Sequence, residues 1–261
     1  MKKILFIIIF ICSFISCSDN ETSSNNDDLN IQLTQCIPSG LQTNLIAFYP
    51  FNSGSLDDVS NSNDLTNLTS ASPAMDRNGN IDCAYKFEFT NGEYLTTNNT
   101  YFLNNLSEFS ISLWFKMDVD SPGGYSVLIS RDESTSTPCD VFGQWSLGLY
   151  DIDYPTFGLM GSVWDLYDWQ GSTDIIDFDQ WHHLVATYKT TDNALAIYRD
   201  GILRDSSTGI CDLPAAPTYQ DIGDLFIGKF YDGKIDDIAI FNISLNQSQV
   251  TEMFEMETCC L

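Results

Sequence analysis

Apolar and polar residues alternate along many segments of this chain, and this alternation limits the folds open to it. In residues 109–117 every second side chain is large and apolar, and the side chains between them are Ser110, Ser112, Trp114 and Lys116. A period of two places successive side chains on opposite faces of a β-strand, so one face can be buried. Residues 109–117 are therefore predicted to form a strand with one face in a core.

Further strands are predicted from the same pattern. The candidate segments are 45–49, 85–89, 94–96, 125–129, 145–150, 156–160, 183–188, 194–199, 225–227 and 235–241. Clusters of Asn, Asp, Gly and Ser separate them, and Asp200-Gly201 is a two-residue hairpin signal after 194–199. Many short strands without intervening helices predict an all-β protein, a two-sheet antiparallel sandwich.

One short helix is expected near the C-terminus. Asn246 is a capping residue, Gln249 follows three positions later, and Val250, Met253 and Phe254 recur at helical spacing. We expect this helix to pack on the edge of the sandwich.

The charge balance excludes some partners. The chain has 36 acidic and 11 basic residues, a formal net charge of −25, yet 43% of its residues are hydrophobic, enough for a core. Phosphate binding needs clustered Lys and Arg, so we expect no nucleic acid partner. Adsorption to anionic lipid is excluded for the same reason. The many carboxylates and Asn side chains suit hard cations or sugar hydroxyls, although solvation alone explains most of them.

The N-terminus has the pattern of an export signal. Lys2 and Lys3 precede an apolar run, residues 4–15, which is too short to span a bilayer as a helix. Ser16-Cys17 resembles a bacterial lipobox, although an ordinary signal peptide that contains a cysteine would look similar. We predict a signal peptide (1–16), lipidation at Cys17, a flexible acidic tether (17–35) and one domain (36–261). This predicts an outer membrane lipoprotein on the surface of a Gram-negative cell, held at the membrane by its lipid anchor only.

Six cysteines remain outside the signal and the lipobox. They are Cys36, Cys83, Cys139, Cys211, Cys259 and Cys260. An even number in an exported protein indicates three disulfides, for which about 15 connectivities exist. No pair has the spacing of a zinc or redox site.

Three segments resemble the laminin G-like jelly rolls of the concanavalin A-like lectin/glucanase superfamily. They are 45–52 with 58–61, 109–116 with 181–188, and 226–228 with 233–242. The resemblance implies a jelly roll whose first and last strands are neighbours. It follows that Cys36 pairs with Cys259 or Cys260, that Cys83 pairs with the other of these two, and that Cys139 pairs with Cys211.

The resemblance also implies a structural calcium ion. Members of this group hold Ca²⁺ with an Asp of the early loop and an Asp of the last strand, which here correspond to Asp58 and Asp236, and Asn63 adds an oxygen to the early loop. Ca²⁺ binds about 6–8 oxygen ligands, and this loop is rich in them. The alternative is an Asx-turn with ordinary carboxylates.

Catalytic residues are not expected. Glucanases with this fold align acids along one strand, and no such strand is present in the sequence. His182 and His183 follow Trp181 at a strand start, where we expect packing and hydrogen bonding.

Aromatic and acidic residues interleave in residues 164–169. Trp164, Tyr167 and Trp169 could stack on sugar rings, and Asp168 could accept hydrogen bonds from hydroxyls. The alternative is that the rings close the sandwich under a long loop. The combined prediction is a non-catalytic surface protein that binds an extracellular polysaccharide or glycoprotein. A protein-adhesion module, or a glycoside hydrolase or polysaccharide lyase of the same fold, stay open as alternatives.

Overall fold

A computed structural model describes residues 36–118, 124–132, 144–151, 154–159, 165–169, 176–208 and 223–260. The signal peptide, the tether, Cys17, Cys139, Trp164 and Cys211 lie outside these residues, so the predictions made for them are not addressed by the structure.

The described residues form two antiparallel sheets. The strands are β1 (Leu45–Tyr49), β2 (Thr66–Asn67), β3 (Ser72–Ala74), β4 (Ala84–Phe87), β5 (Leu95–Thr97), β6 (Glu108–Met117), β7 (Tyr125–Asp132), β8 (Trp145–Tyr150), β9 (Tyr154–Leu159), β10 (Leu166–Tyr167), β11 (Trp181–Lys189), β12 (Ala194–Arg199), β13 (Ile202–Ser207), β14 (Asp224–Ile227) and β15 (Gly233–Phe241). Short 3₁₀ helices are η1 (Gln42–Asn44), η2 (Asn52–Gly54), η3 (Phe89–Asn91) and η4 (Tyr101–Leu103), and α2 spans Gln247–Phe254.

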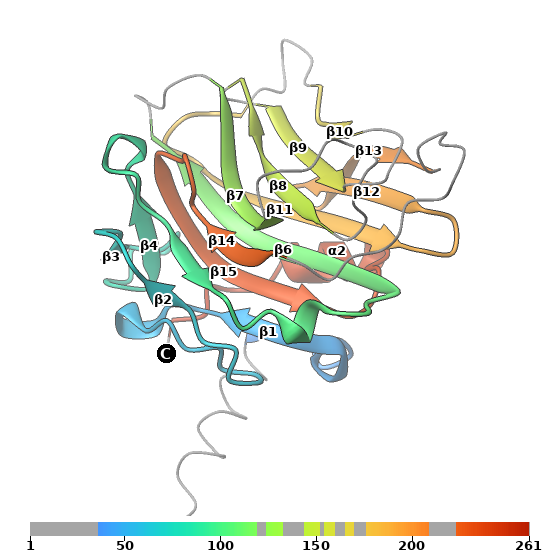
Figure 1. The fold of residues 1–261 in the computed structure, drawn as a ribbon, viewed down its shortest axis with the longest axis horizontal. Helices are drawn as coiled ribbons and strands as arrows, with labels where there is room; N and C mark the ends of the chain where they lie inside the picture. The colour runs from blue at the N-terminus through green and yellow to red at the C-terminus, as the bar shows by residue number, and fades with distance from the viewer. Residues whose placement is uncertain are drawn as a thin grey trace, which may run out of the picture.

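The eight-stranded sheet has the order β13-β12-β11-β6-β15-β4-β3, with β1 also paired to β15, and the seven-stranded sheet has the order β10-β9-β8-β7-β14-β5-β2. Figure 1 shows the sheets as two layers, with β7, β8, β9 and β14 lying over β6, β11 and β15. This confirms the predicted two-sheet sandwich.

The core lies between the two sheets and follows the alternation of the sequence. The apolar side chains of β6, from Phe109 to Met117, are all at most 3% exposed and belong to one buried cluster. A second cluster lies on the outer face of the eight-stranded sheet, where Val250 and Met253 of α2 pack against Val185 and Phe241. Each sheet therefore buries its inner face in the core between them. Among the described residues, only the eight-stranded sheet also packs a helix on its outer face.

The first and last strands are neighbours, as the resemblance implies. Leu45 pairs with Phe241 and Tyr49 with Ile238. A bulge interrupts β15 between Asp236 and Ala239, where its pairing changes from β4 to β1.

The predicted hairpin and the predicted helix cap are both present. Asp200 and Gly201 have φ of 51° and 78° and join β12 to β13. The Asn246 side chain accepts hydrogen bonds from the N–H groups of Ser248 and Gln249, while the Gln249 side chain accepts from the Asn246 N–H.

Two disulfides fasten the chain ends. Cys36 is bonded to Cys259 and Cys83 to Cys260, which is one of the two arrangements that the resemblance leaves open. Among the described residues, no helix has the length and apolar character needed to cross a membrane.

Candidate functional site

Four aromatic rings meet on the outer face of the seven-stranded sheet. We call Tyr150, Tyr154, Tyr167 and Trp169 the ring cluster. Trp169 stacks on Tyr167 with ring centroids 4.8 Å apart and lies 5.2 Å from Tyr154, while Tyr150 meets Tyr167 edge-on at 5.7 Å. Tyr150 and Trp169 are nevertheless 45% and 64% exposed.

The strand register explains why these rings gather. Leu147, Leu149, Phe157 and Leu166 point into the core, so the alternate residues of β8, β9 and β10 point outward. Tyr150 pairs with Tyr154 across the β8–β9 ladder. In the next rows Gly148 pairs with Thr156, and Thr156 pairs with Tyr167.

A fifth ring lies flat beside the cluster because Gly148 has no side chain. Tyr125 pairs with Tyr150 on the neighbouring strand, and its hydroxyl donates to Ser146 Oγ at 2.6 Å. The ring thus crosses Gly148, and a Cβ there would lie 3.3 Å from Tyr125 Oη and would collide with the Ser126 carbonyl. Tyr125 is 42% exposed, so it extends the aromatic surface toward β7.

Asp165 brings a carboxylate to the same face. A Cβ on Gly158 would lie 2.6 Å from Asp165 Oδ1, so the glycine gives the carboxylate room above β9. Partial burial raises the pKa of Asp165, and burial together with the Asp165 charge raises the pKa of Tyr167. Asp165 belongs to the interleaved acidic and aromatic segment 164–169, but the sequence did not single it out as an acceptor, because the room that Gly158 gives its carboxylate is not visible in the sequence.

Asp168 has a different role from the one predicted. It is 2% exposed, and its two oxygens lie 2.8 Å from Arg199 Nε and 2.8 Å from Arg204 Nε. These arginines belong to β12 and β13 of the other sheet. The buried carboxylate therefore fastens the two sheet edges together and does not reach a ligand.

The other predicted ring positions divide between surface and core. Tyr167 and Trp169 come together at the surface, as the sugar hypothesis requires. Trp145 of β8, by contrast, is 5% exposed and packs on Phe109 with centroids 5.6 Å apart.

The predicted calcium ligands have other partners. Asp58 is 4% exposed, and its Oδ1 accepts hydrogen bonds from the N–H of Phe48 (2.9 Å), the N–H of Ser60 (2.9 Å) and the Ser60 hydroxyl (2.6 Å). Its Oδ2 accepts from the N–H of Asn61 (3.2 Å), the N–H of Asn63 (3.0 Å) and Asn63 Nδ2 (3.0 Å). A carboxylate offers about four lone-pair sites, so these donors fill it.

Asp236 lies in a separate buried group at the bulge of β15. Its Oδ2 is 3.5 Å from Arg77 Nη1, and Arg77 also pairs with Asp237 at 2.5 Å. Burial and the Asp237 charge raise the pKa of Asp236 well above its ordinary value. As arranged, Asp58, Asn63 and Asp236 do not fit a shared calcium ion, because N–H donors fill Asp58 and a guanidinium faces Asp236. The calcium site stays an untested prediction.

The two histidines are packed and hydrogen-bonded. His183 is 1% exposed between Trp114 and Phe254, and its Nε2 lies 2.8 Å from Ser112 Oγ. His182 Nδ1 lies 2.8 Å from Asp200 Oδ2. Asp200 thus contacts the ring of the histidine that does not contact the serine, and its carboxylate meets His183 only through the backbone N–H of that residue, so the three groups do not form a catalytic triad.

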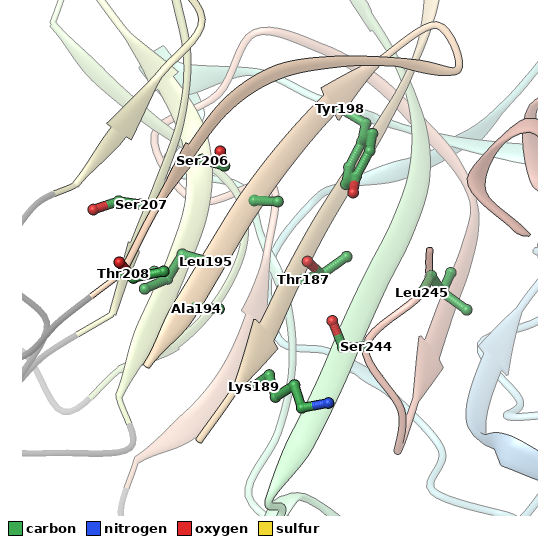
Figure 2. A pocket seen from close by; sticks show the side chains of 11 residues that line it. Thr187, Lys189, Ala194, Leu195, Tyr198, Ser206, Ser207, Thr208, Ser244 and Leu245 are labelled. Carbon is green, nitrogen blue, oxygen red and sulfur yellow. The ribbon is translucent and has the colours of Figure 1, made fainter. Parts of the chain in front are cut away.

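A hollow of about 470 Å³ lies on the opposite sheet. Its floor crosses β11, β12 and β13, where Thr187 pairs with Ala196 and Ala196 with Ser206, and Ser244 and Leu245 form one side (Figure 2). The hollow exists because β12, the middle of the three strands, carries the small side chains of Ala194 and Ala196 there. Its ring, Tyr198, is only 8% exposed. The hollow therefore offers hydroxyls but little aromatic surface, and the ring cluster is the stronger candidate.

Two twisted antiparallel sheets packed face to face, with neighbouring end strands, define a jelly roll of the concanavalin A type. A laminin G family model described as the concanavalin A-like lectin/glucanases superfamily matches residues 89–251, more than half of the chain. The chain belongs to this family.

Solved structures share this fold at low sequence identity. The binding domain of Paraclostridial Mosquitocidal Protein 1 has a TM-score of 0.60 and 16% identity over 82% of this chain and 52% of that chain. The structure titled "Cell entry of botulinum neurotoxin type C is dependent upon interaction with two ganglioside molecules" has a TM-score of 0.60 and 15% identity over 83% and 52%. This chain thus spans about half the length of the toxin structures.

A third structure matches over almost its whole length. Domain 4 of AbnA, a GH43 extracellular arabinanase from Geobacillus stearothermophilus, in complex with arabinotriose, has a TM-score of 0.58 and 19% identity over 81% of this chain and 98% of that chain. No curated protein sequence matches the chain significantly.

Proposed function

We propose that this protein binds extracellular glycan, without catalysis, at the ring cluster. The observation that carries the proposal is Trp169, which is stacked on Tyr167 and contacts Tyr154, and yet is 64% exposed. Large rings are normally buried, and a ring held in place at the surface is ready to stack on the C–H face of a sugar at little entropic cost. Asp165 supplies an acceptor for sugar hydroxyls beside the rings.

The comparisons support this proposal at the level of the fold. The arabinanase domain was solved with arabinotriose, and the botulinum neurotoxin type C structure concerns interaction with gangliosides. Since the fold hosts many functions, the ring cluster itself has to carry the choice of ligand class.

A binding role is favoured over hydrolysis by the state of Asp168. Glycoside hydrolysis needs two carboxyl groups, either about 5–5.5 Å or about 6.5–9.5 Å apart, that are free to act on the sugar. Asp168 is neutralised by Arg199 and Arg204 and so cannot partner Asp165.

We also propose that the domain is displayed on the cell surface through a lipid at Cys17. The support is the sequence alone: the apolar run that ends at Ser16-Cys17 and the acidic segment after it. Replacing Cys17 by Ser should release the protein from the membrane fraction and abolish acyl labelling. A C17S protein that still carries labelled lipid would contradict the anchor.

A glycan array followed by titration calorimetry tests the binding proposal. Trp169→Ala and Tyr167→Ala should each weaken binding of the best array ligand by about tenfold, because each removes a stacking ring. Tyr101→Ala is the matched control, since Tyr101 is 82% exposed but lies outside the cluster. A blank array with capture of a protein partner would favour the adhesion alternative, and release of reducing sugar would favour a hydrolase.

A further inference from the structure

A lysine lies over two aromatic rings at another position on the seven-stranded sheet. Lys229 Nζ lies 4.5 Å from the ring centroid of Phe226 and 5.3 Å from that of Phe230. Phe230 in turn contacts Phe89 at 6.3 Å, and these two rings are 48% and 39% exposed. We call Phe89, Phe226, Lys229 and Phe230 the lysine group.

The backbone is strained at Phe230, one member of the lysine group. Phe230 has φ of 61°, in the left-handed region that bulky side chains rarely adopt. An exposed ring held by an unfavourable backbone is a feature that clusters at functional sites.

Among the described residues, no carboxylate lies beside the Lys229 ammonium. The other described surface lysines Lys86, Lys116 and Lys189 each have a carboxylate oxygen within 4.0 Å. Within the described residues Lys229 has none, although acidic residues outnumber basic ones 36 to 11. Only Lys234 shares this property, and it lies on β15 in the other sheet.

Strand pairing joins the lysine group to the ring cluster. The N–H of Val127 donates to the Lys229 carbonyl at 2.9 Å, and Val127 pairs with Gly148, the glycine that Tyr125 crosses. Phe226 lies on the outer face of the same sheet, since Leu225 and Ile227 on either side of it are fully buried. Across the strand order β10-β9-β8-β7-β14 the two groups are up to four strand spacings apart, about 19 Å in the direction across the strands, and several sugar rings can cover a separation on this scale.

We propose that the lysine group is a second subsite of the same glycan site and that it binds one acidic sugar unit of an otherwise neutral chain. This inference rests on the proposed glycan-binding function. The exposed rings of Phe89 and Phe230 contact the sugar ring, Phe226 holds the Lys229 ammonium against its face, and the ammonium binds the carboxylate. An acidic group gains a charge-assisted hydrogen bond here that a neutral hydroxymethyl group does not.

A single acidic unit fits the charge of the molecule better than a polyanion. The net charge of −25 repels a chain of many acidic units, whereas one carboxylate in contact with Lys229 lies within the screening length of about 8 Å at physiological salt. The proposed ligand is therefore a mostly neutral glycan with an occasional uronic acid.

Matched monosaccharides test the subsite directly. The probes are the methyl glycosides of glucuronate, galacturonate and mannuronate, each compared with its neutral hexoside, with amide chemical shifts of Lys229 and Phe230 as the readout. At least one uronate should bind about fivefold more tightly than its neutral counterpart, the scale of an exposed ion pair. Lys229→Gln should remove the preference, and Lys229→Arg should retain it.

Lys234→Gln is the control, because it removes the same charge from the opposite sheet. Equal binding of every uronate and its hexoside, or a preference that persists in Lys229→Gln, would overturn the second subsite. Neutral oligosaccharides that still bind at Tyr167 and Trp169 would show that the proposed function survives that result. Absence of any glycan binding to the wild-type protein would overturn both.

Discussion

Asp168 shows how one buried residue can hold the candidate site in place. It lies directly between Tyr167 and Trp169 in the chain, and its ion pairs with Arg199 and Arg204 fix the backbone that presents both rings. Because Asp168 and Arg199 are at most 3% exposed, water cannot solvate either charge when its partner is removed.

Asp168→Asn should therefore lower the free energy of unfolding by about 3–5 kcal/mol, since it removes the negative charge that pairs with the buried Arg199 guanidinium and with the half-buried Arg204. Urea denaturation measures the change. Asp179→Asn is the control: it breaks the ion pair to Lys116, but the Asp179 side chain is 68% exposed, so a clearly smaller loss than that of Asp168→Asn is expected. Equal losses in the two variants would contradict the role of Asp168.

His183 predicts a pH dependence of stability. Burial lowers the pKa of His183 to about 3, Arg77 adds to the effect and Asp200 opposes it. An unfolded histidine titrates near pH 6.5, so between about pH 6.5 and 3 only the unfolded chain binds the proton. Stability due to neutral His183 is thus fully present above pH 6.5 and is lost as pH falls, by at most about 1.4 kcal/mol per pH unit.

The comparison of wild type with His183→Gln isolates this contribution, because the raised pKa of Asp236 acts in the opposite direction in both proteins. Between pH 7 and 4.5 the wild type should lose up to about 2–3 kcal/mol more than the variant. The same loss in both proteins would show that His183 does not stay neutral in the fold.

At the scale of elements, the C-terminal tail is fastened where β15 changes partners. Cys259 and Cys260 bind two different early segments, and the Cys259 N–H donates to Asp237 Oδ2 at 3.2 Å. Arg77 adds a hydrogen bond to the Met256 carbonyl. The tail therefore holds the first and last strands together.

Removing the bond between Cys83 and Cys260 with a double alanine variant should destabilise the protein by about 3–5 kcal/mol in the chain-entropy model, because the bond closes a loop of 177 residues. Thermal unfolding measures the loss, and the reduced wild type should be less stable than the variant because it lacks both bonds. Non-reducing peptide maps should also show Cys139 joined to Cys211; a peptide that joins Cys36 to Cys260 would contradict the pairing described here.

The strands that could be predicted from sequence are those with one buried face. Residues 109–117 alternate because every second side chain enters the core, and they form β6 as expected. β10 and β13 were missed for the opposite reason: β10 has two residues, and most side chains of β13 are exposed or half-buried, so neither carries an apolar period.

The candidate site was predicted only in part. Tyr167 and Trp169 were recognised from their composition within residues 164–169, but Tyr125 reaches the ring cluster across Gly148, which is more than twenty residues away in sequence. Asp168 looked like a sugar ligand because the arginines that neutralise it lie in strands more than thirty residues away.

At the scale of the whole molecule, the effect of Ca²⁺ on thermal stability distinguishes two expectations. The family resemblance implies a bound calcium ion, whereas the geometry around Asp58 and Asp236 does not fit one. Melting curves in EDTA and in millimolar Ca²⁺ should superimpose, because donors fill Asp58 and Arg77 faces Asp236. A melting temperature that rises with the logarithm of free Ca²⁺, and stops rising in Asp236→Ala, would instead support the shared ion.

The indole N–H signals of the tryptophans test the central claim most directly. The chain has five tryptophans, and Trp169→Phe assigns the signal of Trp169. On addition of an array-selected oligosaccharide, the Trp169 signal should shift in a saturable manner, while the signal of Trp145, which is buried in the core, should not move. Saturable glycan binding that leaves the Trp169 signal unchanged would contradict a site at the ring cluster.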